Sequence, residues 1–415
     1  MRRHALLLTT LSLAGCPGRP IPPDAGPDAA IDDARFMFDT TDVPLADIAP
    51  GTPWCALGHD VAGTVIPADF CVREFIAPDQ LHEPRVMAFA PNGDLFVSAP
   101  NQSTGASISN GPGDIVVLAD DNRDGVAEKY VFAHVPDVHG IAFGPDALYF
   151  TTLTTVFRTD YAPGQRVENL ASRTALGSFP TNRAQRWTHG LARTHSGVLI
   201  ATQGVWGAFC PDDNTGTAYR VEGGSLVVQA TGFRNPMYVR CHPTDEVCLL
   251  DELGDDSAVG LAREKVVTVR PNTFFGFPCC AYADHSLSGE TIAACSAATV
   301  ANEDAWFPLN DTPFGLDWER GAWPAPYRNA LFIAKHGSYY SNPRFQGTSI
   351  VFAATDPVTH APIGEFQTFA SGFGESSPQI RRATDVTFAN DGRLYFADDT
   401  GGGVYWIAPT SLTRP

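Results

Sequence analysis

The stretch Val86–Ser98 decides the fold, and it reads VMAFAPNGDLFVS. Apolar residues alternate with other residues on both sides of a Pro-Asn-Gly-Asp turn, which is typical of a β-hairpin. The pattern recurs about one propeller blade apart, at Ile141–Phe150, Leu191–Ile200, Met237–Leu250, Phe314–Ala334 and Val386–Phe396. Six copies predict an all-β protein, a six-bladed β-propeller of four-stranded antiparallel blades.

Repetition around a ring brings the starts of the innermost strands to one central mouth, where a propeller normally places its site. A β-sandwich is the competing architecture, but it does not explain so regular a repeat. The 415 residues show no sustained helical periodicity, and 38 Gly and 33 Pro suit many turns and short strands. We expect the propeller to occupy residues 55–411.

The N-terminus has the features of an export signal. Arg2 and Arg3 precede a short apolar stretch, Ala5–Leu13, which is too short to span a bilayer. The sequence LAGC that ends at Cys16 resembles the lipobox of bacterial lipoproteins, in which the cysteine is lipidated and becomes the mature N-terminus. An ordinary secretory signal with a chance cysteine is the alternative. Because Pro17 follows Cys16, the resemblance favours the outer membrane over the inner one.

On this interpretation residues 1–16 are a lipoprotein signal and residues 17–54 are a tether rich in Pro, Asp and Ala. Loss of residues 1–15 removes two arginines and changes the formal charge from −18 to −20. So acidic a chain argues against nucleic-acid binding, which needs clustered Lys and Arg, but not against an anion held by a few arginines. We expect an exported protein, anchored by lipid to the membrane of the bacterial cell envelope.

Eight cysteines remain once Cys16 is assigned to the lipid, and an even number in an exported chain indicates disulfides. A Cys55–Cys71 bond could tie down the first strand of the domain, and a Cys241–Cys248 bond could clip a hairpin. Separate partners are favoured for the neighbouring Cys279–Cys280, because a bond between adjacent cysteines is strained. The remaining connectivity stays open, and the chain has neither a haem-attachment motif nor zinc-like spacing.

Several later motifs resemble those of one family. They are GFRNP at 232–236, DELGDD at 251–256, NTFFGFP at 272–278, KHGS at 335–338, RRATDV at 381–386 and DDTGG at 398–402. In order and spacing they resemble the soluble PQQ-dependent sugar dehydrogenases, the glucose/sorbosone dehydrogenase family, over roughly residues 71–408. The resemblance implies a quinoprotein oxidoreductase that uses PQQ and Ca²⁺ and acts on a sugar or sugar aldehyde.

PQQ is a planar tricarboxylate quinone, so its site needs cations, a divalent metal and a floor for stacking. Arginine suits carboxylates because its planar fork is bidentate and always charged. By resemblance, Arg234 and Asn235 would contact the quinone oxygens or the cofactor rim. Lys335 and Arg382 would pair with its carboxylates or polar edge, and His139 stands where the family has a polar pocket residue. The alternatives are a structural arginine at 234 and ordinary ion-paired cations at 335 and 382.

Two segments are candidate calcium sites. The resemblance implies that the carbonyls of Gly254 and Asp255 bind Ca²⁺, a hard ion with oxygen ligands, which would polarise the quinone. A plain acidic turn is the alternative there. A second, weaker site is suggested by the loop DDNRDG, in which Asp120, Asn122 and Asp124 place oxygens at alternating positions. That loop lacks the twelfth-position glutamate of an EF-hand, so a solvated acidic hairpin tip is the favoured reading.

Oxidation of a sugar needs a base that takes the hydroxyl proton, and imidazole is suitable near neutral pH. His139 and His189 each precede a glycine and open an inner strand, and His189 opens the blade in which the family carries its base. His189 is therefore the favoured base, with Arg234 stabilising developing negative charge. The following segment is a few residues shorter than in the family. An ungapped alignment would put the base at Arg186 instead of His189, and an acidic neighbour seen in some relatives is Thr188 here.

The leading hypothesis is a lipid-anchored sugar dehydrogenase that passes its electrons to an external acceptor. The main alternative is a non-catalytic cell-surface propeller that binds a glycan or a partner protein, with both His-Gly pairs merely capping strands. A third is a metal-dependent lactonase, which would need carboxylate and amide ligands converging at the mouth. The sequence leaves the sugar, the acceptor and the oligomeric state open.

Overall fold

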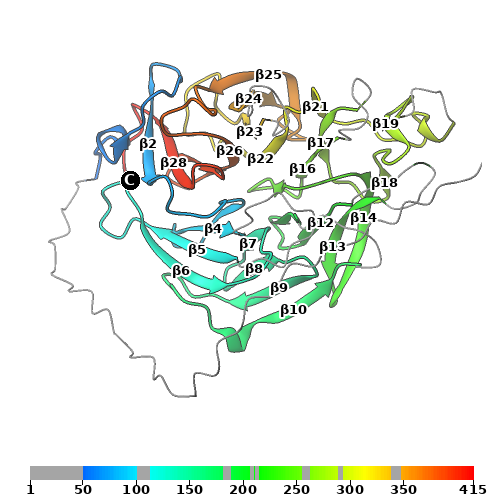
Figure 1. Ribbon diagram of the computed structural model, residues 1–415, viewed down its shortest axis with the longest axis horizontal. Coiled ribbons are helices and arrows are strands. Elements are labelled where there is room, and N and C mark those ends of the chain that lie inside the picture. Colours follow the sequence, from blue (N-terminus) through cyan, green and yellow to red (C-terminus); the bar gives the residue numbers. More distant parts are fainter. Residues whose placement is uncertain are drawn as a thin grey trace, which may run out of the picture. The chain divides into compact units, whose positions relative to one another are not determined.

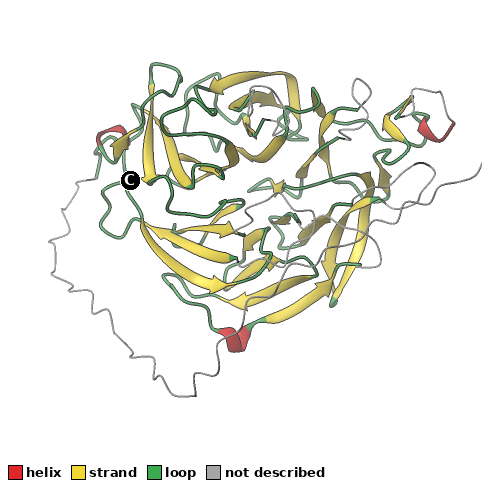
Figure 2. Cartoon of the chain, in the orientation of Figure 1, coloured by secondary structure: helices red, strands yellow, loops and turns green. Residues whose placement is uncertain are grey.

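The computed structural model describes residues 50–100, 113–180, 188–205, 210, 215–254, 262–287, 293–337 and 347–415. Within these ranges strands dominate, as Figure 2 shows, and the helices are short 3-10 turns at Trp54–Ala56, Leu170–Ser172 and Ala293–Cys295. No helix in the described part is long and apolar enough to cross a membrane. The all-β prediction is confirmed, whereas the signal, Cys16 and nearly all of the expected tether lie outside the described residues.

The first three repeats form blades 1 to 3, each numbered from its innermost strand outward (Figure 1). Blade 1 contains β3 (Met87–Phe89), β4 (Leu95–Ala99), β5 (Asp114–Ala119) and β6 (Glu128–His134). Blade 2 contains β7 (Ile141–Phe143), β8 (Ala147–Thr151), β9 (Thr155–Asp160) and β10 (Thr174–Ser178). Blade 3 contains β11 (Leu191–Arg193), β12 (Leu199–Gln203), β13 (Gly216–Glu222) and β14 (Ser225–Phe233), with β18 (Thr273–Phe274) added in parallel at its edge.

The last three repeats form blades 4 to 6. Blade 4 contains β15 (Val239–Cys241), β16 (Cys248–Glu252), β17 (Glu264–Thr268) and β21 (Ala305–Phe307), with a separate hairpin of β19 (Cys280–Tyr282) and β20 (His285–Ser286) inserted before β21. Blade 5 contains β22 (Pro313–Trp318), β23 (Leu331–Lys335), β24 (Ser349–Thr355) and β25 (Pro362–Ala370). Blade 6 contains β26 (Ala383–Phe388), β27 (Leu394–Asp398), β28 (Gly403–Pro409) and β2 (Phe70–Ile76), with β1 (His59–Asp60) at its edge.

The six blades close into a ring. Each innermost strand contacts the innermost strand of the next blade, and β26 of blade 6 contacts β3 of blade 1. The outer strand of blade 6 comes from the start of the folded chain, because β2 pairs with β28 from Phe70 opposite Pro409 to Ile76 opposite Val404. Closure thus joins the two ends of the domain, and the six-bladed prediction is confirmed.

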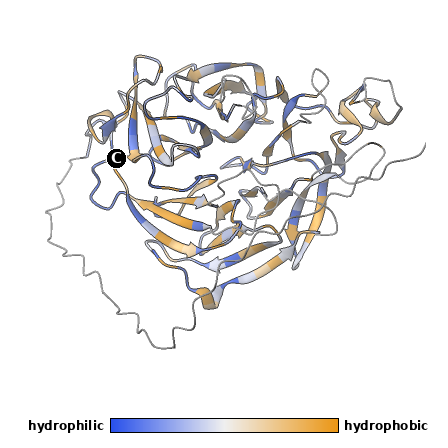
Figure 3. Cartoon of the chain, viewed as in Figure 1, coloured by the Kyte–Doolittle hydropathy of each residue, from blue (hydrophilic) through white to orange (hydrophobic). Residues whose placement is uncertain are grey.

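Face-to-face packing of the blades explains why the strands are so apolar. The second strands of blades 1, 3, 4 and 6 are buried along their whole length, because both of their faces pack against neighbouring blades. The outer strand β14 is instead exposed or half-buried over its first five residues and becomes buried only toward Phe233, and Figure 3 shows mixed colouring along the outer strands. The turn glycines Gly93, Gly197 and Gly392 all have positive φ, which accounts for glycine at this place in the repeat.

The two ends of the described domain lie on the face away from the mouth. β26 begins at the mouth and runs away from it, and each following strand of blade 6 reverses direction. The fourth strand, β2, therefore starts at the face opposite the mouth. There Gly51 N donates to the Arg414 carbonyl at 3.1 Å, and Trp54 lies 3.6 Å from the guanidinium of Arg393. Trp54, the last residue of the expected tether, is therefore part of the folded unit.

All eight cysteines of the domain pair with one another. The bonds are Cys55–Cys71, Cys210–Cys279, Cys241–Cys248 and Cys280–Cys295. Both suggested local pairs are confirmed, and the adjacent Cys279 and Cys280 have separate partners. Four disulfides are typical of an exported protein.

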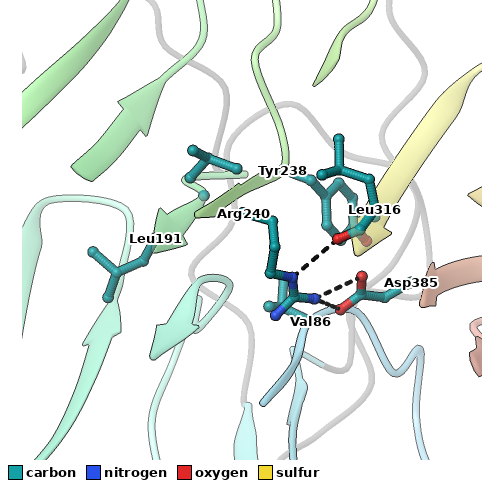
Figure 4. A pocket seen from close by; sticks show the side chains of 9 residues that line it. Val86, Leu191, Tyr238, Arg240, Leu316 and Asp385 are labelled. Carbon is teal, nitrogen blue, oxygen red and sulfur yellow. Dashed lines mark hydrogen bonds and ion pairs between the residues drawn. The ribbon is translucent and has the colours of Figure 1, made fainter. Parts of the chain in front are cut away.

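An ion pair fills the axis of the ring, below the mouth (Figure 4). Arg240 of β15 lies 3.1 Å from the Asp385 carboxylate of β26 and also donates to the carbonyls of Met87 and Leu316. Asp385 accepts from Met87 N at 2.7 Å, and the space beside it exists only because residue 315 is glycine. The cavity at this level is about 10 Å³, close to the smallest volume that holds a water molecule. One ion pair thus ties blades 1, 4, 5 and 6 together.

Candidate functional site

The candidate site is the mouth, the end of the ring at which the innermost strands begin. Arg85, His139, His189, Tyr238 and Arg382 each stand one or two residues before an innermost strand. Four of the connections between second and third strands at this end include residues outside the described part, at 101–112, 206–209 with 211–214, 255–261 and 338–346. The residues at the starts of the innermost strands are all described, and the site is built from them.

Charged and polar side chains from three blades, buried except for the partly exposed Arg85, form a chain across this floor. Arg85 lies 2.9 Å from Asp399, and Asp399 lies 2.9 Å from His336 Nε2. Arg382 Nη2 lies 2.6 Å from His336 Nδ1 and 2.6 Å from the Gly337 carbonyl. Residues 85 and 399 are at opposite ends of the domain, and closure of the ring brings them together.

The chain of contacts fixes the protonation state of His336. A guanidinium can only donate, so His336 Nδ1, which faces Arg382, must be the acceptor. The proton is then on Nε2, which donates to the Asp399 carboxylate. Burial, with the nearby charge of Arg382, lowers the pKa of His336 to about 3, in agreement with a neutral ring. Burial alone would raise the pKa of Asp399, but His336 and Arg85 lower it below its usual value.

The neutral His336 makes stability depend on pH. Its folded pKa of about 3 lies below the unfolded value of 6.5, so the stabilisation is complete above pH 6.5 and is lost as pH falls toward 3. We expect His336→Gln, which can still accept and donate, to flatten the fall in unfolding free energy between pH 6.5 and 4 by up to about 1.4 kcal/mol per pH unit. Urea unfolding at stepped pH measures this slope.

Burial raises the pKa values of the carboxyls Asp385 and Asp398 to about 6, so these two groups increase the unfolding free energy as the pH falls. Their contribution is the same in the wild type and in His336→Gln, and it therefore cancels when the two slopes are compared. Val228→Ala, at an exposed position that carries no titratable group, is the control and should leave the slope as in the wild type. An unchanged slope in His336→Gln would contradict the neutral ring.

An aromatic row runs beneath the mouth beside these charges. The ring of Tyr238 lies 5.4 Å from that of His139 and 5.3 Å from that of Phe314, and Phe314 stacks on His336 at 4.1 Å. All four side chains are at most 4% exposed. Tyr238 is positioned by Asp251, whose Oδ1 accepts from Tyr238 N at 3.2 Å and whose pKa burial raises well above its usual value. The row packs the interior of the ring directly beneath the mouth and supports the charged side chains above it.

The two candidate histidines differ in their surroundings. Burial and the nearby guanidinium of Arg85 lower the pKa of His139 to about 3, and its ring belongs to the aromatic row. His189 is equally buried, but its ring lies 4.1 Å from that of Phe179 of blade 2. Gly140 N donates to the His189 carbonyl at 3.0 Å, so the two His-Gly pairs adjoin across blades 2 and 3.

Arg234 and Gly254, which the family resemblance singled out, lie close together beside blade 4. Arg234 Nη1 donates to the Gly254 carbonyl at 2.5 Å, and Arg234 N donates to Glu252 at 3.0 Å. Gly254 N in turn donates to Glu264 at 2.9 Å. Asn235 is buried and lies 3.2 Å from Thr188 across to blade 3. The structure therefore brings Arg234, Gly254 and two buried carboxylates into one cluster.

Lys335 stands apart from the charged chain on the mouth floor. Its ammonium group pairs with Asp311 at 2.6 Å, at the end of β23. The neighbouring residue His336, in the same motif, is the one that contacts Arg382. Asp255 and Arg186 lie outside the described residues.

The acidic loop of the second calcium candidate is the tip of the hairpin between β5 and β6. Asp120 accepts from Gly125 N at 3.1 Å, and Asn122 and Asp124 accept from backbone groups of the same loop. Burial raises the pKa of Asp120 to about 6. The loop lies on the face away from the mouth, where the Asp124 carbonyl accepts from Gly58 N.

No known protein-family profile matches the chain. Among solved structures, the calcium structure of the Trichoderma reesei carbohydrate-active enzyme family AA12 is 16% identical, covers 84% of this chain and 98% of that one, and has a TM-score of 0.65. The holo pyranose dehydrogenase PQQ domain of Coprinopsis cinerea is 15% identical, with coverages of 85% and 99% and a TM-score of 0.64. The soluble aldose sugar dehydrogenase of Escherichia coli, in the apo form, is 14% identical, with coverages of 82% and 99% and a TM-score of 0.59.

At such identities the likeness shows the fold alone: a propeller like that of the PQQ sugar dehydrogenases and the AA12 family. One curated relative, an uncharacterized protein of Borreliella burgdorferi, is 27% identical over 185 residues, or 43% of this chain. The match spans 48% of that protein, about half of its length.

Sequence reasoning missed four residues of the axis and the mouth: Arg85, Tyr238, Arg240 and, as a partner of Arg85, Asp399. Arg85 could have been found, because it directly precedes the first repeat as His139 and His189 precede theirs. Nothing in the local sequence marks Arg240, because it lies within an ordinary strand pattern. Only closure of the ring places its side chain on the axis.

Proposed function

We propose that the protein is an exported, PQQ- and Ca²⁺-dependent oxidoreductase that oxidises a sugar or sugar aldehyde at the mouth of the propeller. One observation carries the proposal: the buried Arg382 and the partly buried Arg85 stand beside an aromatic row at the point where all innermost strands begin. A propeller of this kind is shared with the pyranose dehydrogenase PQQ domain and the aldose sugar dehydrogenase.

The described residues fit a planar polycarboxylate. Arg382 and Arg234 would face its carboxylates or quinone oxygens, with Asn235 as an amide partner and the rigid row of Tyr238 and Phe314 as support. Ca²⁺ would take the Gly254 carbonyl, which has a second lone pair beside its contact with Arg234, together with Asp255. Bound PQQ would supply the two-electron acceptor, and Ca²⁺ would polarise it.

His189 is the proposed base. His139 would line the site as a neutral side chain. A proton placed on His139 would lie beside the Arg85 guanidinium in a buried position, which opposes protonation. His189 lies on the next blade, blade 3, where its ring packs on Phe179. It would accept the hydroxyl proton while Arg234 stabilises developing negative charge.

The proposed cellular setting follows from the N-terminal sequence. A lipid on Cys16 would anchor the protein to the cell envelope, and the domain receives its N-terminal connection on the face away from the mouth. The mouth would therefore be open to a soluble sugar and to an external electron acceptor.

Titration with PQQ and CaCl₂ tests the proposal. We expect a saturable change in quinone absorbance that EDTA reverses, and bleaching on addition of a reactive sugar from a panel, with an artificial dye as acceptor. Arg382→Gln should weaken PQQ binding about tenfold or more, whereas Lys335→Gln, at a residue that is paired with Asp311 and stands apart from Arg382, should change it less. Absence of PQQ binding in the presence of Ca²⁺ would sink the proposal.

A further inference from the structure

A stacked group of side chains stands at the outer edge of blade 4, away from the axis. It consists of Trp306 on the outermost strand β21, Arg263 just before β17, and Tyr282 and His285 on the inserted hairpin. Trp306 is 54% exposed, although tryptophan is largely buried in most proteins. Figure 1 shows the β19 hairpin standing out from the rim next to β17 and β21.

The four side chains form a continuous ladder. The Arg263 guanidinium lies 3.3 Å from the centroid of the Tyr282 ring and 5.1 Å from that of Trp306. His285 stacks on Tyr282 at 4.0 Å with an interplanar angle of 29°. Such cation–π contacts fix the planes of both aromatic rings. Arg263 is held in turn by Glu303 at 2.7 Å, so its charge is balanced.

The platform is rigid before any ligand arrives. Cys280–Cys295 lies within the inserted segment, and Cys210–Cys279 links it to the connection between β12 and β13 of blade 3. These two bonds already hold the hairpin in place, so attachment of the hairpin does not require an exposed tryptophan. A rigid aromatic surface binds with little loss of conformational entropy, which is how pre-organisation improves affinity.

We propose that Trp306, with Arg263, Tyr282 and His285, is a binding platform for a neutral saccharide. The C–H groups of a pyranose ring present an apolar face that packs on an indole. Hydroxyls at the edge of the sugar would accept hydrogen bonds from Arg263 and His285 and donate one to the Glu303 carboxylate. The arrangement of one exposed ring with a few polar groups around it is that of a small-ligand site.

Two other classes of ligand fit less well. An anionic ligand would meet a cation that Glu303 already neutralises, on a protein of net charge −18. A stable protein partner needs about 800 Å² of surface on each side, far more than one exposed tryptophan and its neighbours supply. A neutral saccharide needs neither a net charge nor a large flat area.

The platform also adjoins the candidate site. Gly254 lies so close to the start of β17 that an added Cβ would come within 2.7 Å of the Arg263 carbonyl oxygen. From β15 at the axis to β21 there are three strand spacings, about 14 Å in all. A saccharide chain bound on Trp306 would therefore extend over blade 4 toward the mouth. The platform does not depend on the proposed redox activity, because it is built from other side chains.

Native affinity electrophoresis and calorimetry of the full chain, without PQQ, test the platform. The probes are cello-, malto- and xylo-oligosaccharides and a soluble neutral glucan. We expect one of these series to bind the wild type, and Trp306→Ala to weaken that binding about tenfold or more, the effect of losing about 1.4 kcal/mol of contact. Trp306→Phe, which keeps a ring, should restore part of the affinity.

Val228→Ala is the matched control, because Val228 is also 54% exposed on an outermost strand, β14, and should leave binding unchanged. Equal binding by the wild type and Trp306→Ala, or no binding by the wild type to any probe, would overturn the proposal. Because redox activity is not measured here, failure of the platform and failure of the proposed dehydrogenase are separate results.

Discussion

Replacing Asp385 by asparagine is expected to lower the free energy of unfolding by up to about 3–5 kcal/mol, the cost of leaving a buried charge without its partner, because the Arg240 side chain that loses its partner is only 18% exposed. Asp385 is 0% exposed and faces Arg240 at 3.1 Å, in the middle of the ring. The amide can still accept from Met87 N, but the guanidinium would lose its only anionic contact among the described residues. Urea unfolding followed by circular dichroism measures the change.

The partner variant Arg240→Met should behave differently with pH. Burial raises the pKa of Asp385 to about 6 even though Arg240 lowers it, so loss of Arg240 raises that pKa further. Asp385 then takes a proton and becomes neutral, and the cost of Arg240→Met should be smaller at pH 5 than at pH 8. The double variant, compared with both single ones, isolates the pair. A loss below about 1 kcal/mol for Asp385→Asn would refute the axial pair as a main tie between blades.

The second large effect concerns catalysis. Once PQQ, Ca²⁺ and a reactive sugar are established, His189→Gln should lower kcat/KM by about 10²–10⁴, the range for loss of a general base. Binding of PQQ should remain, because glutamine keeps the polarity and most of the volume. Steady-state kinetics with a dye acceptor, together with PQQ titration, separate the two effects.

His139→Gln is the matched variant, because His139 is equally buried and also precedes a glycine on the neighbouring blade. Its pKa of about 3 makes it a poor proton acceptor, so its replacement should disturb binding more than the rate of the chemical step. If His139→Gln abolished turnover and His189→Gln did not, the assignment of the base would be reversed.

Most of the fold could be predicted because its signals are local. Alternation around the turns at Gly93, Gly197 and Gly392 marks hairpins within about a dozen residues. The same holds for the Cys55–Cys71 and Cys241–Cys248 bonds, whose partners are close in sequence. The Cys210–Cys279 bond joins residues 69 positions apart, and only the folded chain reveals it.

The site was predictable only in part. A resemblance of motifs singled out Arg382, and the structure places it on the mouth floor in contact with His336. The separate motif KHGS suggested Lys335, which the structure pairs with Asp311 instead, whereas the next residue, His336, contacts Arg382. Successive residues of a strand point to opposite sides, so a one-residue difference decides which side chain faces the arginine.

The sequence by itself determined the repeat, the number of blades and the end of the ring at which polar side chains gather, because these depend on residues close along the chain. Only the tertiary structure decided that Arg85 meets Asp399, that Arg240 meets Asp385, and that Trp306 stands exposed beside Arg263. Such pairs come from distant parts of the chain, and ring closure selects them by packing and by the cost of leaving a buried charge unpaired.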